Sequence, residues 1–197
     1  MKFVRFLLFP FAILYDLITS IRNSFFNIGI FKETSFNTPI IVVGNLSVGG
    51  TGKTPQIEYL IRLLKDFYKV SVLSRGYKRK TKGFILVNGN HTANDVGDES
   101  LQYFKKFTNI TVAVDENRVE GVSNLLNQKS PEVLLLDDAY QHRKVKGSFY
   151  ILLTKYDDLF TDDFLLPTGN LRESRLGAKR ANIIVVTKCS LCSSNFL

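Results

Sequence analysis

The chain has 197 residues, enough for one domain with a substantial buried core, and 45% of its residues are hydrophobic. Its net charge of +8 favours an anionic partner, such as a nucleotide, a phosphorylated substrate, a nucleic acid or a phospholipid surface. Its two cysteines, Cys189 and Cys192, exclude a disulfide framework and favour a reducing compartment. Their C-x-x-C spacing leaves two interpretations open: half of a metal or redox site, or two ordinary thiols.

The N-terminus predicts an apolar helix with cations near its ends. Phe, Leu and Ile cover a broad face, and Lys2, Arg5 and Arg22 flank it. Pro10 and Asp16 interrupt the apolar run before it reaches the ~20 residues of a spanning helix, and no convincing signal-peptide cleavage site follows. Two interpretations stay open. The helix lies in the plane of a membrane with its cations toward anionic headgroups, or it packs on the core of its own domain.

After Pro39, short apolar runs alternate with helical patterns. Strands are expected at 40–43, 70–74, 83–88, 110–114, 132–138, 149–154 and 181–188, and helices at 53–67, 99–107 and 116–128. Most of these strands are apolar throughout, which is typical of strands covered on both faces. The order predicts an α/β fold with a mostly parallel sheet flanked by helices. No linker divides the chain, so the predicted division is the N-terminal helix, 1–30, and one domain, 31–197.

A glycine-rich stretch, VGNLSVGGTGKTP, joins the first strand of this domain to its first helix. Its end matches the phosphate-loop pattern G-x-x-x-x-G-K-[ST], although Ser47 stands where the pattern has its first glycine. Backbone N–H groups and a helix N-terminus at the carboxyl end of a strand attract phosphate. Lys53 is expected on the β- and γ-phosphates and Thr54 on Mg²⁺. The predicted site for ATP or GTP comprises Val48, Gly49, Gly50, Thr51, Gly52, Lys53 and Thr54.

A second motif, LLLDDAYQHR, ends an apolar strand with two carboxylates, Asp137 and Asp138. Adjacent carboxylates are costly unless they are solvated or near a cation, and Mg²⁺ bound to ATP is such a cation. Asp137 has the place of the metal-binding acid, which leaves Asp138 for a supporting or catalytic role. The reverse assignment stays open, and two solvated loop aspartates are the alternative.

Five motifs together resemble one family. VGNLSVGGTGKTP is followed by LSRGYKRK, VGDES, DDAYQHRKV and LLPTGNLRES, in the order of the tetraacyldisaccharide 4′-kinases, the lipid A kinases of Gram-negative bacteria. The resemblance extends from the N-terminal helix to about Lys188. It implies a P-loop NTPase-like fold and transfer of the γ-phosphate of ATP to the 4′-hydroxyl of a tetraacyl disaccharide 1-phosphate. It also implies attachment to the cytoplasmic face of the inner membrane through the N-terminal helix.

Matched motif by motif, the resemblance implies roles for individual residues. Asp98 corresponds to the proposed catalytic base, which would accept the proton of the sugar hydroxyl. An N-cap role for Asp98 is the alternative. Arg75, Tyr77 and Arg172 match positions around the active site, where an arginine grips phosphate through two hydrogen bonds. His142 is a candidate contact to metal or substrate, with a purely structural hydrogen bond as its alternative.

The sequence also departs from the family pattern. Ala139, Tyr140, Asn170 and Ser174 stand where the family has Gly, Phe, Pro and Pro. The family continues past 181–188 through further sheet and helices, including a histidine thought to pair with the catalytic aspartate. We therefore expect a truncated member. The alternatives are a membrane-bound nucleotide-binding remnant with little turnover and a soluble P-loop kinase for a small metabolite. Nucleic-acid binding is supported only by the positive net charge and is not expected.

Overall fold

The computed structural model describes residues 5–189, which form two compact units. The first unit comprises residues 5–31, 45–52 and 151–189, and the second comprises 32–44 and 53–150. Lys2 and Cys192 lie outside the described residues, so the predictions made for them stay predictions.

The second unit is built on a sheet in the order β3–β4–β2–β5–β1. Four of these strands run parallel to one another, namely β1 (Ile40–Asn45), β2 (Val70–Ser74), β4 (Thr111–Val114) and β5 (Val133–Asp137). The two-residue strand β3 (Ile85–Leu86) pairs antiparallel with β4. The parallel strands are almost entirely buried, as their continuous apolar runs predict.

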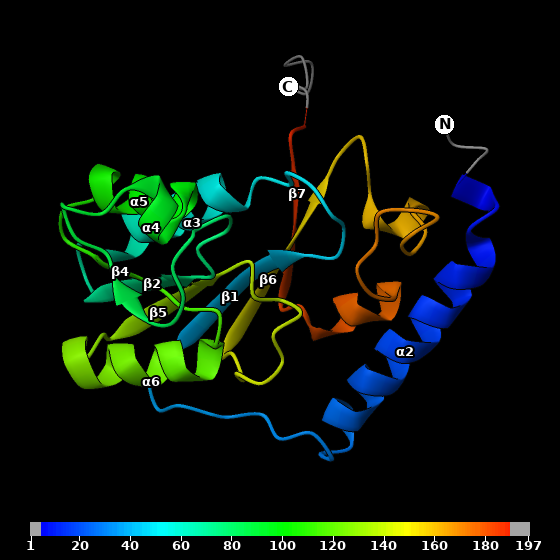
Figure 1. Ribbon diagram of the computed structural model, residues 1–197, viewed down its shortest axis with the longest axis horizontal. Coiled ribbons are helices and arrows are strands. Elements are labelled where there is room, and N and C mark those ends of the chain that lie inside the picture. The colour runs from blue at the N-terminus through cyan, green and yellow to red at the C-terminus, as the bar shows by residue number, and fades with distance from the viewer. Residues whose placement is uncertain (1–4, 190–197) are drawn as a thin grey trace, which may run out of the picture. The chain divides into compact units, whose positions relative to one another are not determined.

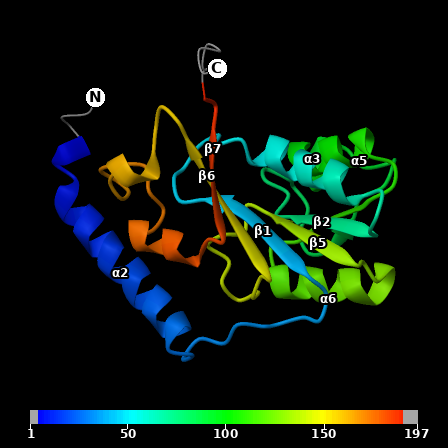
Figure 2. The same cartoon turned by 180° about the vertical axis from the view of Figure 1, so that it is seen from behind.

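Helices cover both faces of this sheet. The helices α3 (Lys53–Leu64), α4 (Ala93–Val96) and α5 (Asp98–Lys106) lie on one face and α6 (Arg118–Lys129) on the other (Figure 1; Figure 2 shows the reverse view). Ile57 and Ile61 of α3 are fully buried, and Val122 and Leu125 of α6 pack into the core between helix and sheet. Their spacing places each pair on one side of its helix. The predicted α/β fold is confirmed, and α4 is an addition to the predicted elements.

The strand register gathers the functional motifs at one edge of the sheet. Val43 lies opposite Asp137, and Ser74 lies opposite Val114. The carboxyl ends of the parallel strands therefore meet, and the segments that follow them emerge together. This edge is where an open α/β sheet binds its ligands.

The first unit contains the helix α2 (Phe9–Asn27) and the parallel pair β6 (Phe149–Lys155) and β7 (Ile183–Thr187). Two 3₁₀ helices, Phe160–Asp162 and Arg175–Arg180, lie between these strands in the sequence. Pro10 lies in the first turn of α2, where its missing N–H costs no intrahelical hydrogen bond, so the helix is continuous through it.

One side of α2 packs on its own unit. The Tyr15 hydroxyl donates to the backbone oxygen of Arg172 at 2.9 Å, and Asn23 donates to the Glu173 carboxylate at 3.0 Å. Arg5, expected to face lipid headgroups, instead donates to the backbone oxygens of Pro167 and Gly169. Large side chains elsewhere on the helix are exposed: Phe9, Phe11, Ile13, Leu14, Leu17, Ile18 and Ile21. Across residues 5–189, no helix has both the length and the apolar content to cross a bilayer.

Candidate functional site

The glycine loop leads directly into α3. Gly49 and Gly52 have φ angles of 107° and 88°, in the left-handed region that glycine adopts without strain. Val48, Gly49 and Gly50 are exposed, whereas Thr51 is buried. Lys53 and Thr54 are the first two residues of α3. Both therefore lie at the N-terminus of a helix, where the backbone N–H groups favour an anion.

The two aspartates at the end of β5 occupy different environments. Asp137 is the last residue of β5 and is buried, whereas Asp138 is partly exposed and has a left-handed φ of 47°. Oδ1 of Asp138 lies 3.6 Å from Nζ of Lys53. Burial, together with the negative charges of Glu99 and Asp138, raises the pKa of Asp137 to about 7. A cation is therefore the natural partner for Asp137, because it would favour the ionised form of that carboxyl.

Two side chains of α5 complete the surroundings of Asp137 and Thr54. The Thr54 hydroxyl donates to Glu99 Oε1 at 3.2 Å, and the Tyr103 hydroxyl donates to Asp137 Oδ2 at 3.1 Å. Burial and the neighbouring Asp137 raise the pKa of Tyr103, so its hydroxyl keeps the proton that it donates.

A buried arginine, Arg118, connects the carboxyl ends of β4 and β5. Arg118 donates to the backbone oxygens of Asp115 and Asp137, which follow or end β4 and β5. Since β2 lies between those strands, the guanidinium spans its carboxyl end. Burial lowers the pKa of Arg118 to about 10, so the side chain is still a cation at neutral pH.

The motifs that carry Asp98 and Arg75 are packed backbone to backbone. Gly97 has a φ of 83°, and a side chain there would meet the backbone of Gly76 and the Tyr77 oxygen at 3.0 Å. Asp98 follows as the first residue of α5 and is exposed. The N-cap of α5 is Gly97, so the alternative N-cap role for Asp98 is wrong. Arg75 and Tyr77 are also exposed beside this contact.

In the first unit, Arg172 and its neighbours hold the loop that precedes Lys53. The Arg172 guanidinium donates to the side chain of Asn45 and, at 3.2 Å, to its backbone oxygen. The backbone N–H of Val48 donates to Asn170 at 2.8 Å, and the hydroxyl of Thr187 donates to the Thr51 oxygen at 2.8 Å. Arg172, predicted to contact substrate, is thus also a support for the glycine loop.

His142 lies in a turn after β5. Its backbone N–H donates to Ala139 at 2.9 Å, and its backbone oxygen accepts from Val145. The following residue, Arg143, forms an ion pair with Glu33 at 3.0 Å. The predicted part of the His142 side chain in metal or substrate binding stays a prediction.

The oxygen atoms near Lys53 fit a magnesium ion. Oδ1 of Asp137 is buried and has no hydrogen-bond partner within residues 5–189, and the Thr54 hydroxyl is the second oxygen donor. Mg²⁺ prefers oxygen ligands and is commonly held by one or two protein carboxylates together with phosphate oxygens. Within the same residues, no group of three or more His, Cys, Asp or Glu side chains is placed to hold a metal by itself.

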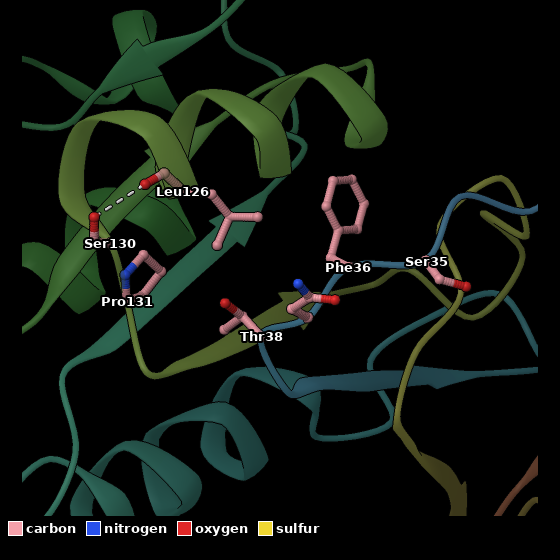
Figure 3. A pocket seen from close by; sticks show the side chains of 7 residues that line it. Ser35, Phe36, Thr38, Leu126, Ser130 and Pro131 are labelled. Carbon is pink, nitrogen blue, oxygen red and sulfur yellow. Dashed lines mark hydrogen bonds between the residues drawn. The ribbon is translucent and has the colours of Figure 1, made fainter.

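A separate pocket of about 480 Å³ lies at the other edge of the second unit's sheet, near the amino ends of β1 and β5 (Figure 3). Phe36, Thr38, Leu126 and Pro131 line it. Ligands of open α/β sheets bind beyond the carboxyl ends of the strands, so this pocket is distinct from the nucleotide site.

Sequence reasoning missed three buried or partly buried side chains of the site: Glu99, Tyr103 and Arg118. Glu99 and Tyr103 are four residues apart and therefore lie on one face of α5. That spacing, beside Asp98, was the available signal for Glu99 and Tyr103. Arg118 follows a strand end and a charged turn, a pattern too common to have singled it out.

A parallel α/β sheet, a glycine loop that enters a helix at Lys53 and Thr54, and an acidic pair after the neighbouring strand define a P-loop nucleotide-binding protein. The chain belongs to the LpxK family, described as tetraacyldisaccharide-1-P 4′-kinase, whose model matches residues 4–195. The resemblance seen in the five motifs is confirmed.

Individual relatives agree with the family. The chain is 66% identical over 190 residues to the tetraacyldisaccharide 4′-kinase of Flavobacterium johnsoniae, covering 96% of this chain and 56% of that one. It is 54% identical over 184 residues to that of Bacteroides thetaiotaomicron, covering 92% and 48%. A crystal structure of "apo" form LpxK from Aquifex aeolicus in complex with ATP is 41% identical with a TM-score of 0.89, covering 98% and 62%. The chain spans about half the length of the curated relatives that it matches.

Proposed function

We propose that this chain acts in lipid A biosynthesis as an ATP-dependent kinase that phosphorylates the 4′-hydroxyl of a tetraacyl disaccharide 1-phosphate. The observation that carries the proposal is the cluster at the start of α3. There Lys53 pairs with Asp138, Thr54 donates to Glu99, and Asp137 accepts from Tyr103. In a member of the LpxK family, this is the machinery of phosphoryl transfer from ATP.

In this proposal each residue of the cluster has a separate task. The loop N–H groups and Lys53 bind the phosphates. When the nucleotide enters, the Lys53 ammonium exchanges its contact with Asp138 for contacts with phosphate oxygens. Thr54 and Asp137 would hold Mg²⁺, which would neutralise the charge that develops on the transferred phosphoryl group. Catalysis then depends on positioning and electrostatics more than on covalent chemistry by the protein.

The acceptor side of the proposal rests on the contact between VGDES and LSRGYK. Asp98 would accept the proton of the sugar hydroxyl during attack on phosphorus. Arg75 and Tyr77, exposed beside the same backbone contact, would bind the anionic substrate. Arg172 supports the glycine loop, and His142 is a further candidate contact to substrate.

The test is transfer of ³²P from [γ-³²P]ATP to the tetraacyl disaccharide 1-phosphate in detergent micelles by the 197-residue chain. Lys53→Ala and Asp98→Ala should each abolish transfer, and Lys65→Ala, which removes a surface lysine paired with Asp66, should leave it unchanged. No transfer, with ATP binding that still needs Lys53, would favour the second candidate, a nucleotide-binding remnant.

We further propose that α2 attaches the protein to the cytoplasmic face of the inner membrane without crossing it. Phe11, Leu14 and Ile18 repeat at helical spacing and are each more than half exposed, as in helices that lie in the membrane interface. Replacing these three residues by Gln should abolish co-flotation with vesicles of phosphatidylethanolamine and phosphatidylglycerol. Leu63→Gln, on an equally exposed apolar residue of α3, is the control. Unchanged flotation of the triple variant would contradict membrane attachment through α2.

A further inference from the structure

We propose that Tyr103 is a positioning residue for the metal: its hydroxyl fixes the Asp137 carboxylate so that one oxygen is turned toward Mg²⁺ bound with the nucleotide. The inference rests on the nucleotide-binding part of the proposed function. Nothing in the motif pattern assigns a role to this tyrosine, which lies on the buried face of α5.

The geometry separates the two oxygens of Asp137. Oδ2 accepts the hydrogen bond from Tyr103 at 3.1 Å, whereas Oδ1 is equally buried and has no hydrogen-bond partner within residues 5–189. A buried carboxylate oxygen without a partner is costly, so the arrangement makes sense when a cation occupies that direction. Tyr103 thereby determines which of the two oxygens stays available.

The tyrosine is also placed to hold the carboxylate plane. The terminal torsion of an aspartate side chain is broad, and a hydrogen bond to one oxygen narrows it. Tyr103 is fully buried on α5, so its own position is set by packing. The side chain of Thr54, the other predicted metal ligand, is hydrogen-bonded to Glu99 of the same helix. Side chains of α5 therefore contact both groups that are expected to hold Mg²⁺.

Removing this hydroxyl should weaken the response to metal and leave the rest of the nucleotide site intact. Partners that orient metal ligands typically contribute about 10- to 100-fold to metal affinity. For the 197-residue Tyr103→Phe chain, we expect about tenfold weaker binding of N-methylanthraniloyl-ATP in the presence of Mg²⁺. With excess EDTA, its affinity for the same nucleotide should equal that of the wild type.

Tyr150→Phe is the matched control. Tyr150 lies in the same unit, and its hydroxyl accepts a hydrogen bond from the Gly147 N–H at 2.7 Å without touching Asp137. This variant also loses a hydrogen-bonded hydroxyl, and its nucleotide affinity should match that of the wild type with and without Mg²⁺. In a second comparison, Tyr103→Phe should cost less in an Asp137→Asn background, because the carboxylate that it orients is gone.

The outcomes separate the inference from the function on which it rests. Wild-type affinity that responds to Mg²⁺, with an equal response in Tyr103→Phe, would overturn the role of Tyr103 alone. Equal weakening of Tyr103→Phe with Mg²⁺ and with EDTA, or a variant that fails to fold by circular dichroism, would assign the hydroxyl to stability and also overturn it. Wild-type affinity without any response to Mg²⁺ would overturn both the inference and the metal part of the proposed function.

Discussion

Nζ of Lys53 lies 3.6 Å from Oδ1 of Asp138, so the cation at the end of the glycine loop and the residue after β5 hold each other. Asp138 has a left-handed φ of 47°, which turns its side chain away from the direction that continued strand geometry would give. The contact holds the lysine ammonium beside the carboxyl end of β5. Because 3.6 Å is long for a hydrogen bond, it leaves the ammonium ready to exchange its partner for phosphate.

Loss of this lysine should therefore affect nucleotide binding far more than folding. Lys53→Ala removes a charge-assisted contact of about 1.5 to 3 kcal/mol, which corresponds to roughly 10- to 100-fold weaker ATP binding. Isothermal titration with ATP and Mg²⁺ measures this change. Lys65→Ala, which breaks the surface pair with Asp66, should leave the ATP affinity unchanged. Equal affinities for the wild type and Lys53→Ala would remove Lys53 from the phosphate site.

Glu58 of α3 should make the stability of the second unit depend on pH. Burial alone would raise the pKa of this carboxyl, but hydrogen bonds from Lys106, Gln102 and Arg62 together lower it below its usual 4.5. A lowered pKa in the folded state means that this stabilisation is present above 4.5 and is lost as the pH falls through the folded-state pKa. Glu58→Gln should cost about 1 to 2 kcal/mol near neutral pH.

Urea unfolding at a series of pH values from neutral to acid measures this effect. The deficit of Glu58→Gln relative to the wild type should shrink as the solution becomes more acid, because the wild-type carboxyl is then protonated as well. Asp66→Asn is the control, since that carboxylate is exposed and its ion pair contributes little. A deficit that stays constant down to acid pH would contradict the stabilising role of the charge.

The fold was predictable because its strands carry a local signal. The runs at IIVV, VSVLS and EVLLLDD are apolar without alternation, which indicates burial on both faces, and glycine and charged turns separate them. The order of the strands in the sheet is a different matter. The placement of β5 between β2 and β1 depends on contacts between distant segments, which periodicity does not encode.

The candidate site was predictable where its residues belong to local motifs, and not where they are brought in by tertiary packing. Lys53, Thr54 and Asp137 follow from motifs that need particular atoms at particular places in the chain. Tyr103 and Glu99 do not, because Tyr103 reaches Asp137 across 34 positions and Glu99 reaches Thr54 across 45. In the sequence Tyr103 is an ordinary aromatic residue on a helix. Its hydroxyl acquires a role only after tertiary packing brings α5 over the end of β5.

The contributions of Asn45 and Arg172 to supporting the glycine loop should be coupled. The Arg172 side chain donates to the side chain and backbone of Asn45, and its backbone N–H donates to Leu46 at 2.7 Å. Either Asn45→Ala or Arg172→Ala alone should weaken ATP binding by loosening the loop. The double variant should be weakened by less than the sum, with a coupling of about 0.5 to 3 kcal/mol. Strictly additive losses in ATP affinity would show that the two residues act independently, and that the effect of Arg172 on ATP binding does not pass through Asn45.

Gly97 should tolerate no side chain, because both its backbone angle and its surroundings oppose one. Its φ is 83°, and a Cβ would lie 3.0 Å from the backbone of Gly76 and from the Tyr77 oxygen, which are atoms that cannot rotate away. Gly97→Ala should therefore lower the free energy of unfolding by about 2 to 4 kcal/mol. It should also separate Asp98 from the loop that carries Arg75, so that phosphoryl transfer falls further than nucleotide binding.

Gly89→Ala is the matched control, since no atom lies within 4 Å of a Cβ there, and its free energy of unfolding should stay within about 0.5 kcal/mol of the wild type. Urea unfolding and the ³²P transfer assay, run on both variants, measure these effects. A Gly97→Ala chain as stable and as active as Gly89→Ala would show that the close approach of VGDES to LSRGYK has no part in the reaction.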